Sequence, residues 1–221
     1  MDEITGNSIL TQEQKELLHS FARSPLSSIF YLSGGTALSA FYLQHRFSED
    51  LDFFTNMEID IENILTFLKS LSGIKEITYE RKYDRKIFLL EYNSGVFLKV
   101  EFTKYPFERL CPVQKLGGLP VDSIEDILAN KLMAMTDRRD PKDYVDVYAI
   151  MQLYPDMGIE GVMGQAENKF GVKGISSILS GRFLDPPECT GIPLLKDINP
   201  SDVKSFFQKT ARALVRRSIG E

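Results

Sequence analysis

Apolar positions near the start of the chain recur at helical spacing. Leu17, Leu18 and Phe21 lie on one stripe, downstream of Thr11. Thr11 and Gln14 have the spacing of a capping box, in which each side chain bonds the other residue's backbone N–H. The pattern therefore predicts an amphipathic helix that begins at Thr11.

Short apolar runs bounded by turn residues predict strands further along the chain. We expect strands over residues 29–32, 50–54, 86–92 and 96–103, and helices over residues 36–44 and 61–68. The last two strands are joined by turn residues 93–95 and form a predicted hairpin. In the second of them Lys99 and Glu101 point away from the apolar face, because strand side chains alternate.

The pattern changes near residue 121. Beyond it nearly all periodicity is helical, and Gly and Pro residues gather between positions 155 and 198. Ser123 is placed to cap one helix, Asp140-Pro141 to begin another, and residues 201–218 form a third. We therefore expect an α+β protein with a mixed sheet flanked by helices over residues 1–121 and a helical domain over residues 122–221.

Composition narrows the class of protein. The chain has 221 residues, of which 43% are hydrophobic and 26% charged, as in ordinary globular proteins. There is no apolar run long enough to span a membrane and no signal-peptide pattern. The two cysteines, Cys111 and Cys189, do not suggest a disulfide framework. We expect a cytoplasmic protein that does not bind membranes.

The net charge is −5, from 26 basic and 31 acidic residues. Such a chain cannot attract polyanions by general positive charge. Phosphate chemistry would therefore need a metal ion or a dedicated basic pocket.

A pair of carboxylates stands out on one predicted strand. Asp50 and Asp52 are two residues apart, so they share a face and lie about 6–7 Å apart at ~3.3 Å per residue. Two such acids repel each other unless a cation lies between them. Mg²⁺ is the natural candidate, since it takes oxygen ligands from one or two carboxylates and from substrate phosphates.

A glycine turn lies just upstream, between a predicted strand and a helix. Gly34 and Gly35 would let the backbone approach a ligand, and the helix N-terminus would favour a phosphate. Ser33 and Thr36 flank the glycines, and the Thr36 hydroxyl could add a hydrogen bond.

Glu101 is the candidate for a third acid, because it lies mid-strand on the face opposite the apolar stripe. Three acids would complete a two-metal site. Each feature alone has an ordinary explanation: a simple turn, a solvated acid pair, or a solvent-facing strand residue. Their order along the chain favours a joint site.

That order resembles a known family. Ser33-Gly34-Gly35-Thr36-Ala37-Leu38, then Arg46, then Ser48-Glu49-Asp50-Leu51-Asp52-Phe53-Phe54 is similar to the signature of the AbiEii/AbiGii-type nucleotidyltransferase toxins, which belong to the DNA polymerase β-like nucleotidyltransferase superfamily. A second block resembles the downstream helical motif of that family: Asp126-Ile127, Lys131-Leu132, Arg139 and Lys142-Asp143-Tyr144-Val145-Asp146. The resemblance covers residues 28–154.

The resemblance implies roles for individual residues. Ser33, Gly34, Gly35 and Thr36 would hold the triphosphate, with Arg46 and Ser48 beside it. Asp50, Asp52 and Glu101 would bind Mg²⁺ or Mn²⁺. In the second block Lys131 would contact the nucleotide, and Asp143 or Asp146 would complete the site.

The second block also has structural explanations. Lys131 lies on a mostly apolar helical face and could extend its stem along it. Arg46 could neutralise Glu49 and Asp50, and Arg139 could pair with Asp143 or Asp146.

The implied function is Mg²⁺-dependent transfer of a nucleoside monophosphate from an NTP to an acceptor hydroxyl, with release of pyrophosphate. The chain would be a toxin with a cognate antitoxin protein, and its acceptor could be the 3′ end of tRNA. Two alternatives stay open: an enzyme that modifies a protein, and a nucleotide-binding module with weak or no catalysis. Basic residues at 81–86 and at 204–217 are candidate nucleic-acid contacts.

Overall fold

The structure is a computed structural model that describes residues 3–218, without the side chain of Ser218. The chain divides into two compact units. Unit 1 comprises residues 1–108 and 112–123, and unit 2 comprises residues 109–111 and 124–221. None of the described helices is long and apolar enough to cross a membrane.

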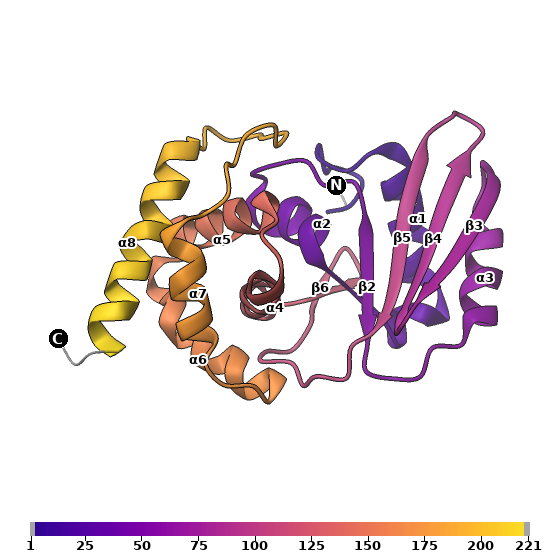
Figure 1. The fold of residues 1–221 in the computed structure, drawn as a ribbon. Helices are drawn as coiled ribbons and strands as arrows, with labels where there is room; N and C mark the ends of the chain where they lie inside the picture. Colours follow the sequence, from indigo (N-terminus) through magenta and orange to yellow (C-terminus); the bar gives the residue numbers. More distant parts are fainter. Residues whose placement is uncertain (1–2, 219–221) are drawn as a thin grey trace. The chain divides into compact units, whose positions relative to one another are not determined.

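Unit 1 is built on a mixed sheet of seven strands in the order β3-β4-β5-β2-β1-β7-β6 (Figure 1). The strands are β1 (Tyr31–Ser33), β2 (Leu51–Thr55), β3 (Ile74–Lys82), β4 (Arg85–Tyr92), β5 (Phe97–Lys104), β6 (Gln114–Leu116) and β7 (Leu119–Val121). The pairs β2–β5 and β1–β7 are parallel, and the other neighbours are antiparallel. The predicted mixed sheet is confirmed.

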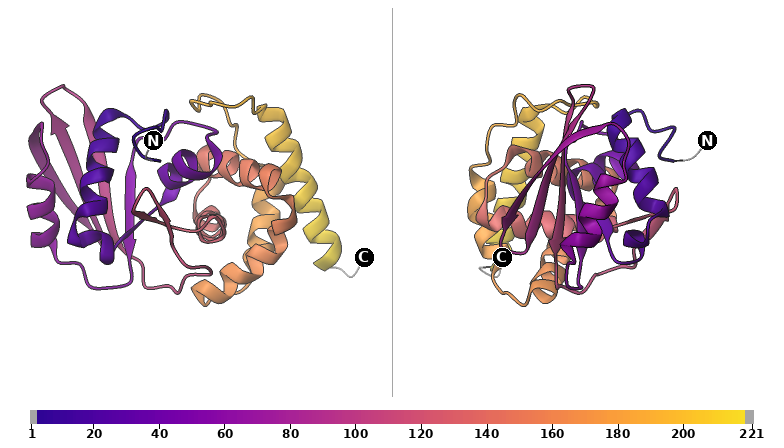
Figure 2. Two further views of the ribbon diagram at one scale, coloured as in Figure 1. Left: turned by 180° about the vertical axis from the view of Figure 1, so that it is seen from behind. Right: turned by 90° about the vertical axis from the view of Figure 1, so that its right-hand side faces the viewer.

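Helices α1 (Gln12–Arg23) and α3 (Ile61–Lys69) cover one face of this sheet (Figure 2). The predicted capping box of α1 is present, with Thr11 and Gln14 bonded reciprocally. Phe21 of α1 stacks on Phe53 of β2 at 4.2 Å between ring centroids, and Phe53 stacks on Phe102 of β5 at 5.1 Å. This aromatic core fixes which face of β2 and β5 points inward.

The segment between β1 and β2 is helical but irregular. Helix α2 (Gly34–Leu38) passes into a π-helical turn (Ser39–Leu43) that ends at Gln44 in the left-handed conformation. The helix predicted over residues 36–44 therefore begins two residues earlier. Likewise the strand predicted at residues 29–32 is shifted to β1, because Pro25–Ser28 forms a 3-10 helix whose end includes Ile29.

Unit 2 is helical among its described residues. It contains α4 (Ile124–Asp137), α5 (Pro141–Leu153), α6 (Ile159–Phe170), α7 (Ile175–Leu184) and α8 (Pro200–Ser218). Asp140 caps α5 by accepting from the Lys142 N–H, and Pro141 follows at the first helical position, as predicted. Tyr144, Phe183 and Phe207 form the aromatic core of this unit.

Candidate active site

The strand register of unit 1 places three predicted site residues in one row. Ser33 of β1 pairs with Asp52 of β2, and Asp52 pairs with Glu101 of β5. Leu51 and Phe53 are buried on the core face, so Asp52 between them points to the opposite face. The sheet therefore brings together residues that are far apart in sequence.

The glycine turn is shaped by the side chains beside it. Gly34 has φ of +72°, and a Cβ there would lie 2.4 Å from Asp52 Oδ2. A Cβ on Gly35 would lie 2.7 Å from Arg46 Nη2 and 2.9 Å from Ser48 Oγ. Gly34 is therefore needed for its positive φ and its close approach to Asp52, and Gly35 leaves room for the side chains of Arg46 and Ser48.

Ser33 precedes α2 but does not cap it with its side chain. Its hydroxyl donates instead to Asp122 Oδ2 at 2.7 Å, and both residues are buried. The Tyr42 hydroxyl donates to the Asp122 carbonyl at 2.7 Å. The first turn of α2, which contains both glycines, therefore receives no side-chain cap from Ser33.

Backbone contacts hold the loop that leads to the acid pair. The Thr36 hydroxyl donates to the carbonyl of Asp50. The Gln14 amide donates to the carbonyls of Ser48 and Glu49, at 3.0 Å each. Thr36 and Gln14 are positioning residues in this arrangement.

Two cations accompany the three acids of unit 1. Lys99 Nζ lies 2.6 Å from Asp50 Oδ2, and Arg85 pairs with both carboxylate oxygens of Glu101. Burial lowers the pKa of Lys99, but its hydrogen bond to Asp50 and the charges of Asp52 and Glu101 outweigh this effect and raise it. Burial also works to raise the pKa of Glu101, yet Arg85, Thr103 and Lys99 together lower it.

The second block forms a buried ion-pair network in unit 2. Lys131 Nζ lies 3.1 Å from Asp143 Oδ1 and 2.5 Å from Asp146 Oδ2. These three side chains are at most 9% exposed. Arg138 adds a second cation, 2.7 Å from Asp143 Oδ2. Burial tends to raise the pKa of Asp143, but Lys131 and Arg138 hold it below its usual value.

One predicted pairing in this block is wrong. Arg139 pairs with Asp185, at 3.0 Å, and it is Arg138 that reaches Asp143. The sequence could not distinguish these two adjacent arginines, because the choice depends on how each side chain leaves the end of α4.

Comparisons with known proteins identify a family and a fold. Residues 16–209 match the family described as "Nucleotidyl transferase AbiEii toxin, Type IV TA system". An uncharacterized protein of Aquifex aeolicus, aq_aa25, is 35% identical over 147 residues, which cover 65% of this chain and 68% of that protein.

Two solved structures share the fold. JHP933 from Helicobacter pylori has a TM-score of 0.62 at 19% identity, covering 94% of each chain. The MenT4 nucleotidyltransferase toxin from Mycobacterium tuberculosis has a TM-score of 0.56 at 18% identity, covering 92% of this chain and 82% of that one.

The chain belongs to the AbiEii nucleotidyltransferase toxin family. It is accordingly a nucleotidyltransferase-family enzyme and a toxin of a toxin–antitoxin system. Its α+β fold, with a mixed sheet and C-terminal helices, is the nucleotidyltransferase fold.

The candidate active site has carboxylates that fit a divalent cation. Within residues 3–218, no three His, Cys, Asp or Glu side chains are grouped closely enough to hold a metal ion by themselves. Strand β2 begins at Leu51, one residue later than predicted, so Asp50 lies just before it and Asp52 lies on it. Asp52 closely approaches Gly34 in the glycine turn, and the two aspartates nevertheless offer hard carboxylate oxygens there. That donor set suits Mg²⁺, which is usually held by one or two carboxylates and completed by water and substrate phosphates.

Four residues that shape the candidate active site were not predicted to belong to it: Gln14, which was predicted only as part of a helix cap, Arg85, predicted only as a nucleic-acid contact, and Lys99 and Asp122. Asp122 lies 89 residues from Ser33, and no local pattern connects them. Lys99 did carry a signal, since it lies on the same strand face as Glu101.

Proposed function

We propose that unit 1 transfers a nucleoside monophosphate from an NTP to an acceptor hydroxyl and releases pyrophosphate. One observation carries this proposal: the register that aligns Ser33, Asp52 and Glu101, with the Asp52 carboxylate directly over Gly34. Carboxylates for a cation and a backbone turn for a phosphate lie together there, as phosphoryl transfer requires.

Asp50 and Asp52 would hold Mg²⁺, or Mn²⁺, which accepts the same hard oxygen ligands. The ion would stabilise charge on the phosphates during an in-line displacement. The backbone N–H groups of Gly35 and Thr36 would bind the triphosphate, supported by the first turn of α2. Arg46 and Ser48, which border Gly35, would contact the phosphate oxygens.

Glu101 would act as the third carboxylate only if Arg85 moves from it, because Arg85 bonds both carboxylate oxygens. Arg85 therefore controls how Glu101 takes part. In unit 2, Lys131 would contact the nucleotide, with Asp143 or Asp146 as its acidic partner.

The acceptor that we propose is RNA, with the 3′ end of tRNA as the first candidate, and the proposed partner is an antitoxin protein. The alternatives are a protein acceptor and a binding module without turnover. The three possibilities predict labelled RNA, labelled protein and no labelled product, so one experiment distinguishes them.

The test is transfer of label from each α-labelled NTP, with Mg²⁺, to total RNA and in parallel to total protein. Asp52→Asn keeps the size of the side chain but removes its charge. We expect it to lose at least about 10²-fold in rate, as when an electrostatic stabiliser is removed. Asp197→Asn, at an exposed position of unit 2, is the matched control and should keep full activity.

Label on RNA that depends on Asp52 would support the proposal. Label on protein alone would show that the acceptor is a protein and not RNA. Full activity of Asp52→Asn would overturn the proposed site, and metal-dependent NTP binding without pyrophosphate release would favour the binding module.

A further inference from the structure

The hairpin that joins β3 and β4 concentrates positive charge at its tip. Four of the six residues from Arg81 to Lys86 are cations. The register pairs Arg81 with Lys86 and Lys82 with Arg85, so like charges lie directly opposite each other twice. Such pairs destabilise a hairpin unless anions compensate them, and here Glu101 compensates Arg85. The chain as a whole has a net charge of −5, so the positive charge at this tip is a local feature.

The turn itself contains an unusual residue. Tyr83 has φ of +54°, a conformation that glycine adopts more readily, and it is 86% exposed. Its ring is therefore neither favoured by the backbone nor buried in the core. An exposed aromatic ring among cations is the arrangement that proteins use to stack on a base of single-stranded nucleic acid.

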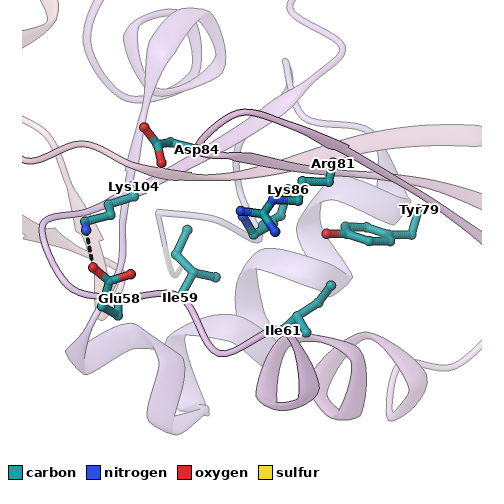
Figure 3. A pocket seen from close by; sticks show the side chains of 8 residues that line it. All are labelled: Glu58, Ile59, Ile61, Tyr79, Arg81, Asp84, Lys86 and Lys104. Carbon is teal, nitrogen blue, oxygen red and sulfur yellow. Dashed lines mark hydrogen bonds and ion pairs between the residues drawn. The ribbon is translucent and has the colours of Figure 1, made fainter.

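A pocket of about 250 Å³ lies beside this tip and opens to solvent (Figure 3). Tyr79, Ile59 and Ile61 form its apolar part, and Tyr79 contacts Phe88 at 5.1 Å between ring centroids. Arg81 and Lys86 reach into it from their paired strands. The remaining lining residues are Glu58, Asp84 and Lys104.

The two acids of the pocket lie on the side of Lys104. Glu58 forms an ion pair with Lys104, and Asp84 also raises the pKa of this lysine, although the hydrogen bond to Glu58 contributes most. Arg81 and Lys86 lie toward Tyr79 (Figure 3). The pocket thus offers an aromatic and aliphatic wall next to two cations, which are the groups that bind a base and its phosphate.

We propose that the β3–β4 hairpin binds single-stranded RNA, with one nucleotide in this pocket and a neighbouring base stacked on Tyr83. Arg81 and Lys86 bind the phosphate of the seated nucleotide. This inference rests on the proposed function, because it supplies a binding surface for an RNA acceptor. It concerns residues other than the acids and glycines of the candidate active site.

The test is the anisotropy of a fluorescent single-stranded RNA titrated with the full chain, without NTP and at several salt concentrations. Arg81→Gln combined with Lys86→Gln should weaken binding at least about tenfold. The slope of log affinity against log salt should fall by about 1.4, as expected for two lost phosphate contacts on a single strand. Lys69→Gln combined with Lys115→Gln removes the same charge from exposed positions elsewhere in unit 1, and it should bind almost as the parent does.

Tyr83→Gly separates RNA binding from folding. Glycine suits the positive φ, so the thermal midpoint should stay equal or rise. RNA binding should nevertheless fall about fivefold, because the stacking ring is lost. Unchanged binding in both the glycine variant and the double glutamine variant would overturn the proposal.

Two further binding measurements test whether the hairpin binds another class of ligand. A free nucleoside monophosphate that competes as well as the RNA strand would show a mononucleotide site and overturn the strand proposal. Loss of binding to an acidic polypeptide, with RNA binding intact, would assign the hairpin to a protein partner instead. Asp52→Asn should bind RNA normally while it loses transfer, so failure of the proposed reaction and failure of this inference give different results.

Discussion

The two units both contain acids neutralised by lysine and arginine, but the surroundings of these acids differ. In unit 1 the Lys99–Asp50 pair is open to solvent, with side chains 36% and 44% exposed. In unit 2 the Lys131–Asp146 pair is 9% and 0% exposed. Exposed pairs exchange partners at little cost, whereas breaking a buried pair leaves a charge without water. The exposed group around Asp50, Asp52 and Lys99, here called the open cluster, is therefore suited to receive a ligand. The buried ion pairs of Lys131 and Arg138 with Asp143 and Asp146, here called the closed network, are suited to stabilise the fold.

A second buried pair in unit 2 supports this contrast. Asp126 bonds Lys169 at 2.6 Å and accepts from the backbone N–H groups of Leu110 and Cys111. Burial works to raise the pKa of Asp126, but these contacts lower it. The pair thus anchors the segment Arg109–Cys111 within unit 2.

The largest expected loss of stability follows from changing the lysine of the closed network to methionine. Lys131→Met leaves the buried acids Asp143 and Asp146 with one cation fewer. We expect unit 2 to lose about 3–5 kcal/mol of stability, measured by urea unfolding. An effect below about 1 kcal/mol would mean that the network is not a structural element, and would strengthen the assignment of Lys131 as a nucleotide contact.

Gly34→Ala tests the open cluster at its most crowded point. Alanine must adopt φ of +72° and its Cβ would meet Asp52 Oδ2 at 2.4 Å. We expect a stability loss of about 1–3 kcal/mol. The rate of transfer should fall about 10²-fold, because a carboxylate displaced by about 1 Å costs that much.

The control is Gly164→Ala on α6, where an added Cβ meets nothing within 4 Å. That change should leave activity intact and slightly stabilise the helix. Equal activities in the two variants would show that Asp52 tolerates movement and that the close approach to Gly34 has no role.

Acid should weaken the closed network through Asp143. Its pKa is lowered in the folded state, so its stabilising contribution is complete above the ordinary pKa near 3.8 and is lost as pH falls through the lowered value. Asp143→Asn should cost about 1–3 kcal/mol at pH 6, by loss of charged hydrogen bonds. The difference between parent and variant should narrow below pH 4 in unfolding experiments, and a constant difference would contradict this assignment.

Lys99→Met is the counterpart of Lys131→Met in the open cluster. We expect a change in stability of no more than about 1 kcal/mol, because the pair is exposed. Asp50 would lose its cation, so binding of Mn²⁺ or Mg²⁺ should become several-fold tighter, as measured by calorimetry without NTP. Unchanged metal affinity would show that Lys99 does not compete for the site.

Much of the fold could be predicted from local patterns. The capping box at Thr11, the hairpin turn at residues 93–95, and the cap at Asp140 depend on residues close in sequence, and the structure confirms each. Strand β3 was missed. It lies at the edge of the sheet and most of its side chains are exposed, so it has no apolar alternation to detect.

The candidate site divides in the same way. Asp50, Asp52 and the glycines stood out because they lie within one strand–turn–helix–strand segment. Asp122 and Arg85 did not, because their roles depend on register between distant strands and on side-chain direction. Sequence patterns therefore predict the acids of the site more readily than the cations that pair with those acids.

The smallest expected effect concerns a hydroxyl in the core of unit 2. The Tyr144 hydroxyl is buried and makes no hydrogen bond to the described residues. Burial raises its pKa, so the phenol stays neutral. Tyr144→Phe removes a polar atom that makes no hydrogen bond to its surroundings, so stability should fall by no more than about 0.5 kcal/mol, or should increase.

Tyr42→Phe in unit 1 is the contrasting variant, because the Tyr42 hydroxyl donates a hydrogen bond to the Asp122 carbonyl. Its loss should cost about 1 kcal/mol. If thermal unfolding showed the larger loss for Tyr144→Phe, the hydroxyl would have an unrecognised partner, and the core of unit 2 would be more polar than its aromatic packing indicates.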